Sequence, residues 1–244
     1  MGVSWVECWK VDYDEVVVDR LFDGKTQLTK ALQPLVEATE TTLDLDAAKR
    51  SRTLVRIDAG GGSLDDVNWL LTRGYHLHCK DYSATRAQRL AQSVQIWVDD
   101  SQVEGRQVGW VCLPAPEYVS PVRRLAVRCR KANGQWGTGV LISTETPSEV
   151  LALTQVPTGS DPNPEAVLLA YVQLYDQRGG GVETSFKGDK QGLGINKRSK
   201  RRGSRPTNGD VVRQPGPQCG RVVPLLVGSS TFETAALRHA EDGA

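Results

Sequence analysis

The stretch "RTLVRIDAGGGSLDDVNWLLTRGYHLHCKDYS", residues 52–83, decides the fold class. Within it, residues 53–57 predict a short buried strand, which ends at Asp58 and is followed by three glycines. Ser63 or an adjacent residue caps a helix that continues to about Arg73, and "GYHLHCK" then predicts a second strand. A strand, a helix and a strand in such close order indicate a βαβ unit, whose strands are parallel. We therefore predict an α/β fold.

The segments on either side extend this unit. Residues 15–22, "EVVVDRLF", are rich in β-branched side chains and predict a strand. Apolar residues recur near helical spacing over 26–45 and predict an amphipathic helix, in which Pro34 either causes a kink or marks a late start. Residues 83–94 predict a further helix.

The middle of the chain has a different pattern. "VGWVC", "RRLAVRCRK" and "QWGTGVLIST" are strand-like runs, and Asn133-Gly134 between the last two is a strong hairpin signal. We expect an antiparallel β insertion at about residues 105–160. Residues 164–178 then predict a helix with Pro164 at an early position.

Composition restricts the class of protein. With 244 residues, 39% of them apolar and 24% charged, the chain is typical of soluble globular proteins and forms one large domain or two smaller ones. Its five cysteines are scattered without a Cys-x-x-Cys pair, which argues against a zinc site and for reduced thiols in the cytoplasm. We find no signal sequence and no apolar run of membrane length.

The net charge of +1 hides an uneven distribution of charge. The segment 187–205 is strongly basic, and its core consists of Lys197, Arg198, Lys200, Arg201 and Arg202. Such a run is either a nucleic-acid patch or a solvated tail, and charge alone does not decide between them.

Two acidic residues are candidates for chemistry. Asp58 follows a buried strand and precedes a glycine turn, which is where open α/β sheets hold ligands, although such an aspartate often only caps the next helix. Glu183 lies beyond three glycines, 179–181, which should break a helix. Tyr175, Arg178 and Lys190 lie around it at helix-like spacing, a pattern that an ordinary surface helix with ion pairs also produces.

The two histidines of "YHLHCK" suggest a metal pair at first sight. Strand alternation puts Leu77 and Cys79 inward, and His76, His78 and Lys80 outward. Without a third ligand nearby, we expect two exposed histidines and no metal site.

Taken in order, residues 52–83, the β-rich middle and "LLAYVQLYDQRGGGVETSFKGDKQGLG" resemble a known family. They are similar to the catalytic domain of bacterial insertion-sequence DDE transposases, in the group with a Tyr-Arg-Glu-Lys signature, over residues 12–202. The resemblance implies a partial RNase H-like α/β domain with an antiparallel β insertion. It also implies metal-dependent DNA cleavage and strand transfer during transposition, with element ends and target DNA as partners and a homodimer in the intact family.

In that family two aspartates and one glutamate hold two divalent ions, Mg²⁺ or Mn²⁺. The resemblance makes Asp58 the second aspartate and Glu183 the glutamate. Tyr175, Arg178 and Lys190 match the other signature positions, with Arg178 and Lys190 on DNA phosphates and the basic core of 187–205 adding attraction for DNA. The gap between Arg178 and Glu183 is one residue longer than in the family, and the glycines could absorb this extra residue.

The sequence departs from the family at both ends. None of Asp12, Asp14, Asp19 and Asp23 has the context of the family's first aspartate, so we expect an incomplete catalytic centre. Residues 203–244 predict irregular structure, and we hypothesise that a frameshift replaced the native C-terminus there. A non-catalytic DNA-binding remnant and a different RNase H-like nuclease remain the alternative functions.

Overall fold

The computed structural model describes residues 3–10, 15–23, 27–57, 62–155, 163–177 and 223–229. Within these ranges lie nine strands: β1 Val3–Lys10, β2 Glu15–Asp23, β3 Thr53–Ile57, β4 His76–Lys80, β5 Val98–Asp99, β6 Arg106–Trp110, β7 Arg123–Arg130, β8 Trp136–Ser143 and β9 Val223–Ser229. The same ranges hold six helices: α1 Leu28–Leu43, α2 Ala47–Arg50, α3 Leu64–Thr72, α4 Ala84–Ala91, α5 Pro147–Thr154 and α6 Pro164–Asp176.

The strands form one mixed sheet in the order β2-β1-β9-β3-β4-β8-β7-β6-β5. Its strands β3 to β8 contain one parallel pair, β3 and β4, with Ile57 level with Cys79. The other neighbouring pairs among these six strands are antiparallel: β4–β8, β8–β7, β7–β6 and β6–β5. The α/β class, the parallel pair and the antiparallel insertion predicted from the sequence are therefore confirmed.

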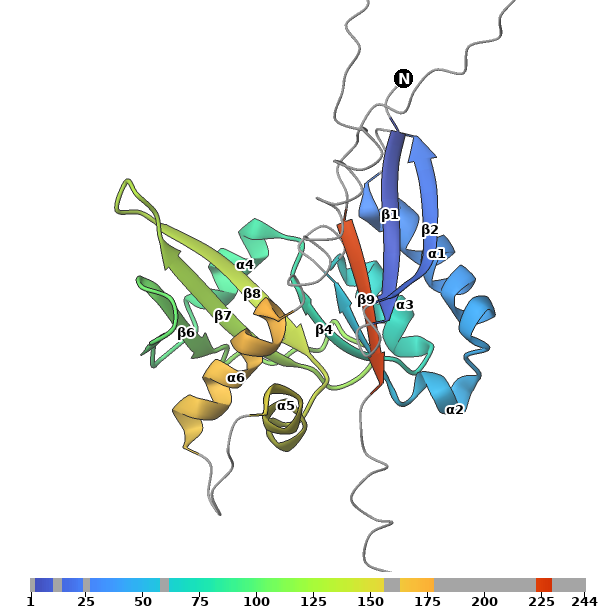
Figure 1. Ribbon diagram of the computed structural model, residues 1–244. Coiled ribbons are helices and arrows are strands. Elements are labelled where there is room, and N and C mark those ends of the chain that lie inside the picture. The colour runs from blue at the N-terminus through green and yellow to red at the C-terminus, as the bar shows by residue number, and fades with distance from the viewer. Residues whose placement is uncertain are drawn as a thin grey trace, which may run out of the picture.

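Helices cover both faces of this sheet (Figure 1). On one face, α1 and α3 pack on β3 and β4, and α4 packs on β7 and β8. On the other face, α5 and α6 pack against each other and against β3, β6, β7 and β8. The β3 and β4 strands therefore have no solvated face, which matters for the polar side chains that they carry.

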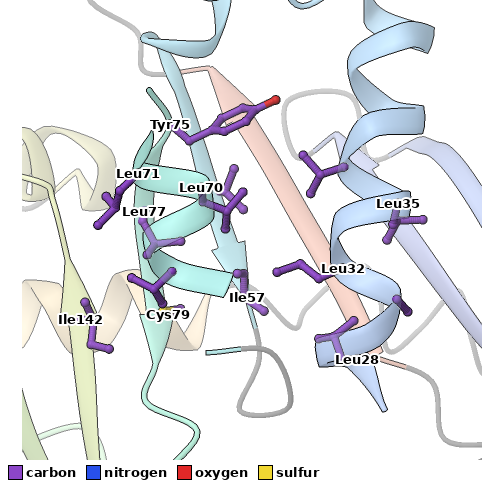
Figure 2. Close-up of a cluster of buried hydrophobic side chains, with 14 of the residues drawn as sticks. Leu28, Leu32, Leu35, Ile57, Leu70, Leu71, Tyr75, Leu77, Cys79 and Ile142 are labelled. Carbon is purple, nitrogen blue, oxygen red and sulfur yellow. The ribbon is translucent and has the colours of Figure 1, made fainter. Parts of the chain in front are cut away.

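The face toward α1 and α3 is apolar. Val55 and Ile57 of β3 and Leu77 and Cys79 of β4 are all 0% exposed, and they point toward the leucines of the two helices. Figure 2 shows Ile57, Leu77 and Cys79 beside the labelled leucines of α1 and α3. Each fully buried aliphatic side chain of this kind contributes about 1.5–3 kcal/mol to stability.

Local sequence signals explain where most helices begin. Ser63, Ser83 and Thr146 accept hydrogen bonds from the backbone N–H three residues on, and so cap α3, α4 and α5. In α1, which begins at Leu28, Pro34 lies inside one helix and does not mark its start.

The tail differs from the sequence-based expectation of irregular structure over 203–244. Residues 223–229, "VPLLVGS", form β9 between β1 and β3. β1 and α5 also have no counterpart among the predicted elements. β9 pairs with strands that are distant in the sequence, and such pairing leaves no local signal beyond a short apolar run.

Candidate functional site

Tyr175 is the one predicted site residue within the described ranges, and it lies in the last turn of α6. The others lie outside the described residues: Asp58, Arg178, Glu183, Lys190, Lys197, Arg198, Lys200, Arg201 and Arg202. The glycines 179–181 also lie outside, while α6 itself ends at Asp176, before them. Within the described residues, the candidate site therefore consists of Tyr175 and the elements that position it.

Two buried polar side chains attach the end of α6 to the parallel strands. Arg56 of β3 is 7% exposed and its Nη1 donates to the carbonyl oxygen of Leu174 at 3.2 Å. His78 of β4, level with Arg56 in the sheet, places Nε2 at 3.0 Å from the carbonyl oxygen of Tyr171. A cation at the C-terminus of a helix binds carbonyls that lack intrahelical donors and interacts favourably with the helix dipole. Arg56 therefore fixes the last turn of α6, and Tyr175 with it, against β3.

The burial of His78 corrects the expectation that both histidines are exposed. Alternation along β4 is as predicted, since His76 and His78 share one face, but α5 and α6 cover that face. His78 is 0% exposed and lies with its ring centroid 6.2 Å from those of Tyr171 and Tyr175. His76 is half-buried and its Nδ1 lies 2.6 Å from Oε1 of the fully buried Glu145. Both histidines serve the packing of helices on the sheet.

An arginine of the β insertion holds the same end of α6. Arg106 of β6 forms ion pairs with Asp176 at 2.6 Å and with Asp100 at 2.5 Å. Burial alone would lower the pKa of the Arg106 guanidinium, but its hydrogen bonds to Asp176 and Asp100 outweigh that effect and raise it. The end of α6 is thus attached to β3, β4 and β6 together.

A pocket of about 360 Å³ lies beside this attachment point. Strand β8 forms its floor, where Gly137 and Gly139 leave the backbone bare, and Tyr175 and Asp176 of α6 line one wall. Lys80, the last residue of β4, also lines it, and a Cβ at Gly139 would lie 2.7 Å from Cε of Lys80. The missing side chain at Gly139 therefore makes room for the stem of Lys80.

Lys80 gives this pocket its positive charge. The charge of Arg106 is balanced by two aspartates, whereas Lys80 has no ion pair among the described residues. Its position follows from the parallel register: Ile57 is level with Cys79, so Lys80 comes at the same edge of the sheet at which β3 ends. Strand alternation predicts only that Lys80 faces outward. A lysine at the carboxyl end of a strand in a βαβ unit was the available signal.

Comparisons of the chain with known protein families, curated proteins and solved structures find no match. Across the described ranges, His, Cys, Asp and Glu do not gather in any group of three or more that could hold a metal ion. In the same ranges, none of the helices combines the length and apolarity needed to cross a membrane.

Proposed function

We propose that this chain is the later part of the catalytic domain of an insertion-sequence DDE transposase of the Tyr-Arg-Glu-Lys group, with a partial RNase H-like fold. The observation that carries the proposal is the attachment of the end of α6 to β3 and β4 through Arg56 and His78. It holds Tyr175, the first residue of the signature, near the two strands, and Asp58 directly follows β3 in the sequence.

The residue types suit phosphoryl transfer on DNA. Asp58 and Glu183 would supply the carboxylate oxygens that Mg²⁺ and Mn²⁺ prefer, and such ions would stabilise the charge that develops on the phosphate. Lys80 offers a charge-assisted hydrogen bond to a backbone phosphate at the pocket, as do Arg178 and Lys190 of the signature. The basic core of 187–205 adds attraction that does not depend on sequence.

The unmatched first aspartate favours binding over cleavage by this chain alone. Two carboxylates would be too few to hold two ions, since three carboxylates hold them in the intact family. We therefore expect non-specific DNA binding without nicking or joining. A non-catalytic DNA-binding remnant is thus the second candidate, and flanking inverted repeats in the DNA would distinguish either from another RNase H-like nuclease.

The test is a salt titration of DNA binding together with a cleavage assay in Mg²⁺ and in Mn²⁺. Affinity should fall steeply with salt, and Lys80→Met should weaken binding to all sequences while reducing the slope of log affinity against log salt by about one. Lys30→Met, at an exposed position of α1, is the matched control and should leave the slope unchanged.

Three outcomes contradict parts of this proposal. A chain that does not bind DNA at low salt would overturn it. If Lys80→Met leaves DNA binding intact, the pocket does not contact DNA. Cleavage that disappears in Glu183→Ala would mean that another acid completes the centre.

A further inference from the structure

An arginine lies between two tryptophans at the outer end of the β insertion. Cζ of Arg128, on β7, lies 4.0 Å from the ring centroid of Trp97 and 4.6 Å from that of Trp136. We call these three residues the Trp97–Arg128–Trp136 stack. It lies on the sheet face that α4 covers, because Trp97 packs with Ala126 and Val140 in the cluster under that helix. The pocket with Lys80 and Tyr175 is on the opposite face.

The stack is accessible and holds an aromatic surface in place. Trp136 is 40% exposed, at the start of β8, in a hairpin that projects away from the neighbouring helices (Figure 1). Nε of Arg128 donates to Oε1 of Gln107 at 2.8 Å, and Nε2 of Gln107 donates to Asp99 at 2.8 Å. These bonds orient the guanidinium between the rings. A planar group that reaches this end of the sheet meets a fixed indole.

The positive charge of the stack is not neutralised by direct contact. Among the described residues, Arg128 forms no ion pair, and its side-chain hydrogen bond goes to a neutral amide. Arg130 lies directly opposite Trp136 across the β7–β8 pair, is exposed, and also lacks an ion pair within the described ranges. Two cations therefore flank an exposed indole.

A second arginine–tryptophan contact in the same molecule differs in this respect. Cζ of Arg73 lies 4.8 Å from the ring centroid of Trp69, but Arg73 is ion-paired with Glu40. That contact lies within the end of α3, and Glu40 of α1 balances the charge of its arginine. The stack at the insertion has the same aromatic chemistry with its charge left available.

We propose that the Trp97–Arg128–Trp136 stack binds unpaired bases of a single-stranded nucleic acid, with a base on Trp136 and adjacent phosphates on Arg128 and Arg130. Bases stack on aromatic side chains independently of sequence, and cations beside the ring follow the backbone. A paired base in a duplex does not expose its flat face, so the stack should discriminate single strands from duplexes. The inference rests on the proposed function, to which it adds a second DNA contact on the opposite sheet face.

The experiment measures affinity of the full chain for oligothymidylate of about 15 nucleotides and for a duplex of equal length. Trp136→Ala should weaken single-strand binding roughly tenfold and leave duplex binding nearly unchanged. Arg128→Met should act in the same direction. Trp69→Ala is the matched control and should change neither affinity. Circular dichroism of each variant checks that the fold is retained.

The outcomes separate this inference from the proposed function. Equal losses for single strand and duplex, or no loss in Trp136→Ala, would mean that the stack only stabilises the hairpin, and would overturn the inference while the transposase proposal stands. If wild-type chain binds neither oligonucleotide, both proposals fail. If Trp136→Ala no longer folds, Trp136→Phe takes its place and should retain most of the single-strand affinity. The inference would be overturned if Trp136→Phe and Arg128→Met each lost as much affinity for the duplex as for the single strand.

Discussion

The two faces of the β3–β4 pair are made from alternating residues of the same short strands, yet they differ in chemistry. Toward α1 and α3 they present Val55, Ile57, Leu77 and Cys79, all apolar or weakly polar and fully buried. Toward α5 and α6 they present the apolar Leu54 and three polar side chains: Arg56, His76 and His78. Both faces are covered, so burial alone does not explain the difference.

The difference indicates a division of labour between the faces. Apolar packing is not directional, and it stabilises the domain without fixing one helix at one residue. Buried hydrogen bonds to carbonyls at the end of α6 are directional and are expensive to break, so they fix where α6 lies and where its last turn ends. The first face should therefore control stability, and the second should control the position of Tyr175. Four substitutions test this division, in order of expected effect on stability.

Leu77→Ala should give the largest loss of unfolding free energy. Leu77 is 0% exposed in the apolar face, and truncation leaves a cavity that costs about 2–5 kcal/mol of unfolding free energy. Urea denaturation measures it. Ile96→Ala, at a side chain that is 75% exposed, is the control and should change stability by less than about 0.5 kcal/mol. A loss no larger than the control's would show that the apolar face is loosely packed.

Arg56→Met should lower the unfolding free energy less than Leu77→Ala does, but its effect should be concentrated in α6. It removes a buried charged donor from the carbonyl of Leu174, at a cost of about 1–3 kcal/mol. Hydrogen exchange should accelerate in the last turn of α6 before it does in α1 or α3. Arg89→Met, an exposed arginine in the last turn of α4, provides the comparison. Uniform acceleration across all helices would contradict the division of labour.

The His76–Glu145 contact should make stability depend on pH. The hydrogen bond to Glu145 raises the pKa of His76, which outweighs the opposing effect of burial, and the charge of Glu149 adds to the rise. A raised pKa in the folded state stabilises the protein fully below the ordinary histidine pKa, near 6.5, and this contribution is lost as pH rises through the raised value. The backbone carbonyl of Glu145 also accepts a hydrogen bond from Nη1 of Arg123 at 3.4 Å.

Denaturant midpoints measured from slightly acidic to alkaline pH check this expectation. The wild type should lose stability across that window, and His76→Gln, which keeps a donor but does not titrate, should lose less. Parallel pH profiles for the two proteins would show that His76 contributes nothing to the dependence.

Gly139→Ala should have the smallest effect on stability and a clear effect on the pocket. The three atoms nearest to the new Cβ all belong to the flexible side chain of Lys80, with Cε at 2.7 Å, so that side chain can move away and stability should change by less than about 1 kcal/mol. The displaced ammonium should weaken DNA binding as Lys80→Met does. Gly134→Ala is not a suitable control, because Gly134 has φ +79 and strain would appear there. Unchanged affinity in Gly139→Ala would show that Lys80 acts without this support.

The sequence predicted elements whose signals are local. The cap of α3 at Ser63, the helix that begins near Ser83 and the Asn133-Gly134 hairpin can each be recognised within a few residues, and each is present. The side to which His78 points was also predictable from alternation. Its burial was not, because the covering helix α6 is contributed by a segment about ninety positions later, and the pattern of a strand does not reveal what covers it.

The candidate site was predictable only in part. Tyr175 could be selected by its spacing and by family resemblance, but its supports could not. Arg56 lies inside a strand that is predicted to be buried, and Arg106 resembles an ordinary surface arginine, but only the fold brings both to the end of α6. The importance of Lys80 depends on the bare backbone at Gly139, a position in a different strand.

Strand β9 has a consequence for the order in which the chain folds. It lies between β1 and β3, so the N-terminal hairpin joins the rest of the sheet through a segment near the other end of the sequence, with Thr53 opposite Ser229. During synthesis β1 and β2 emerge before β9, so β1 cannot complete its pairing until residues 223–229 have been made. Closing so long a loop is slow, and until then the edges of β1 and β3 remain available to other strands. Newly made chains should therefore depend on chaperones, or be prone to aggregation, for as long as residues 223–229 are still within the ribosome.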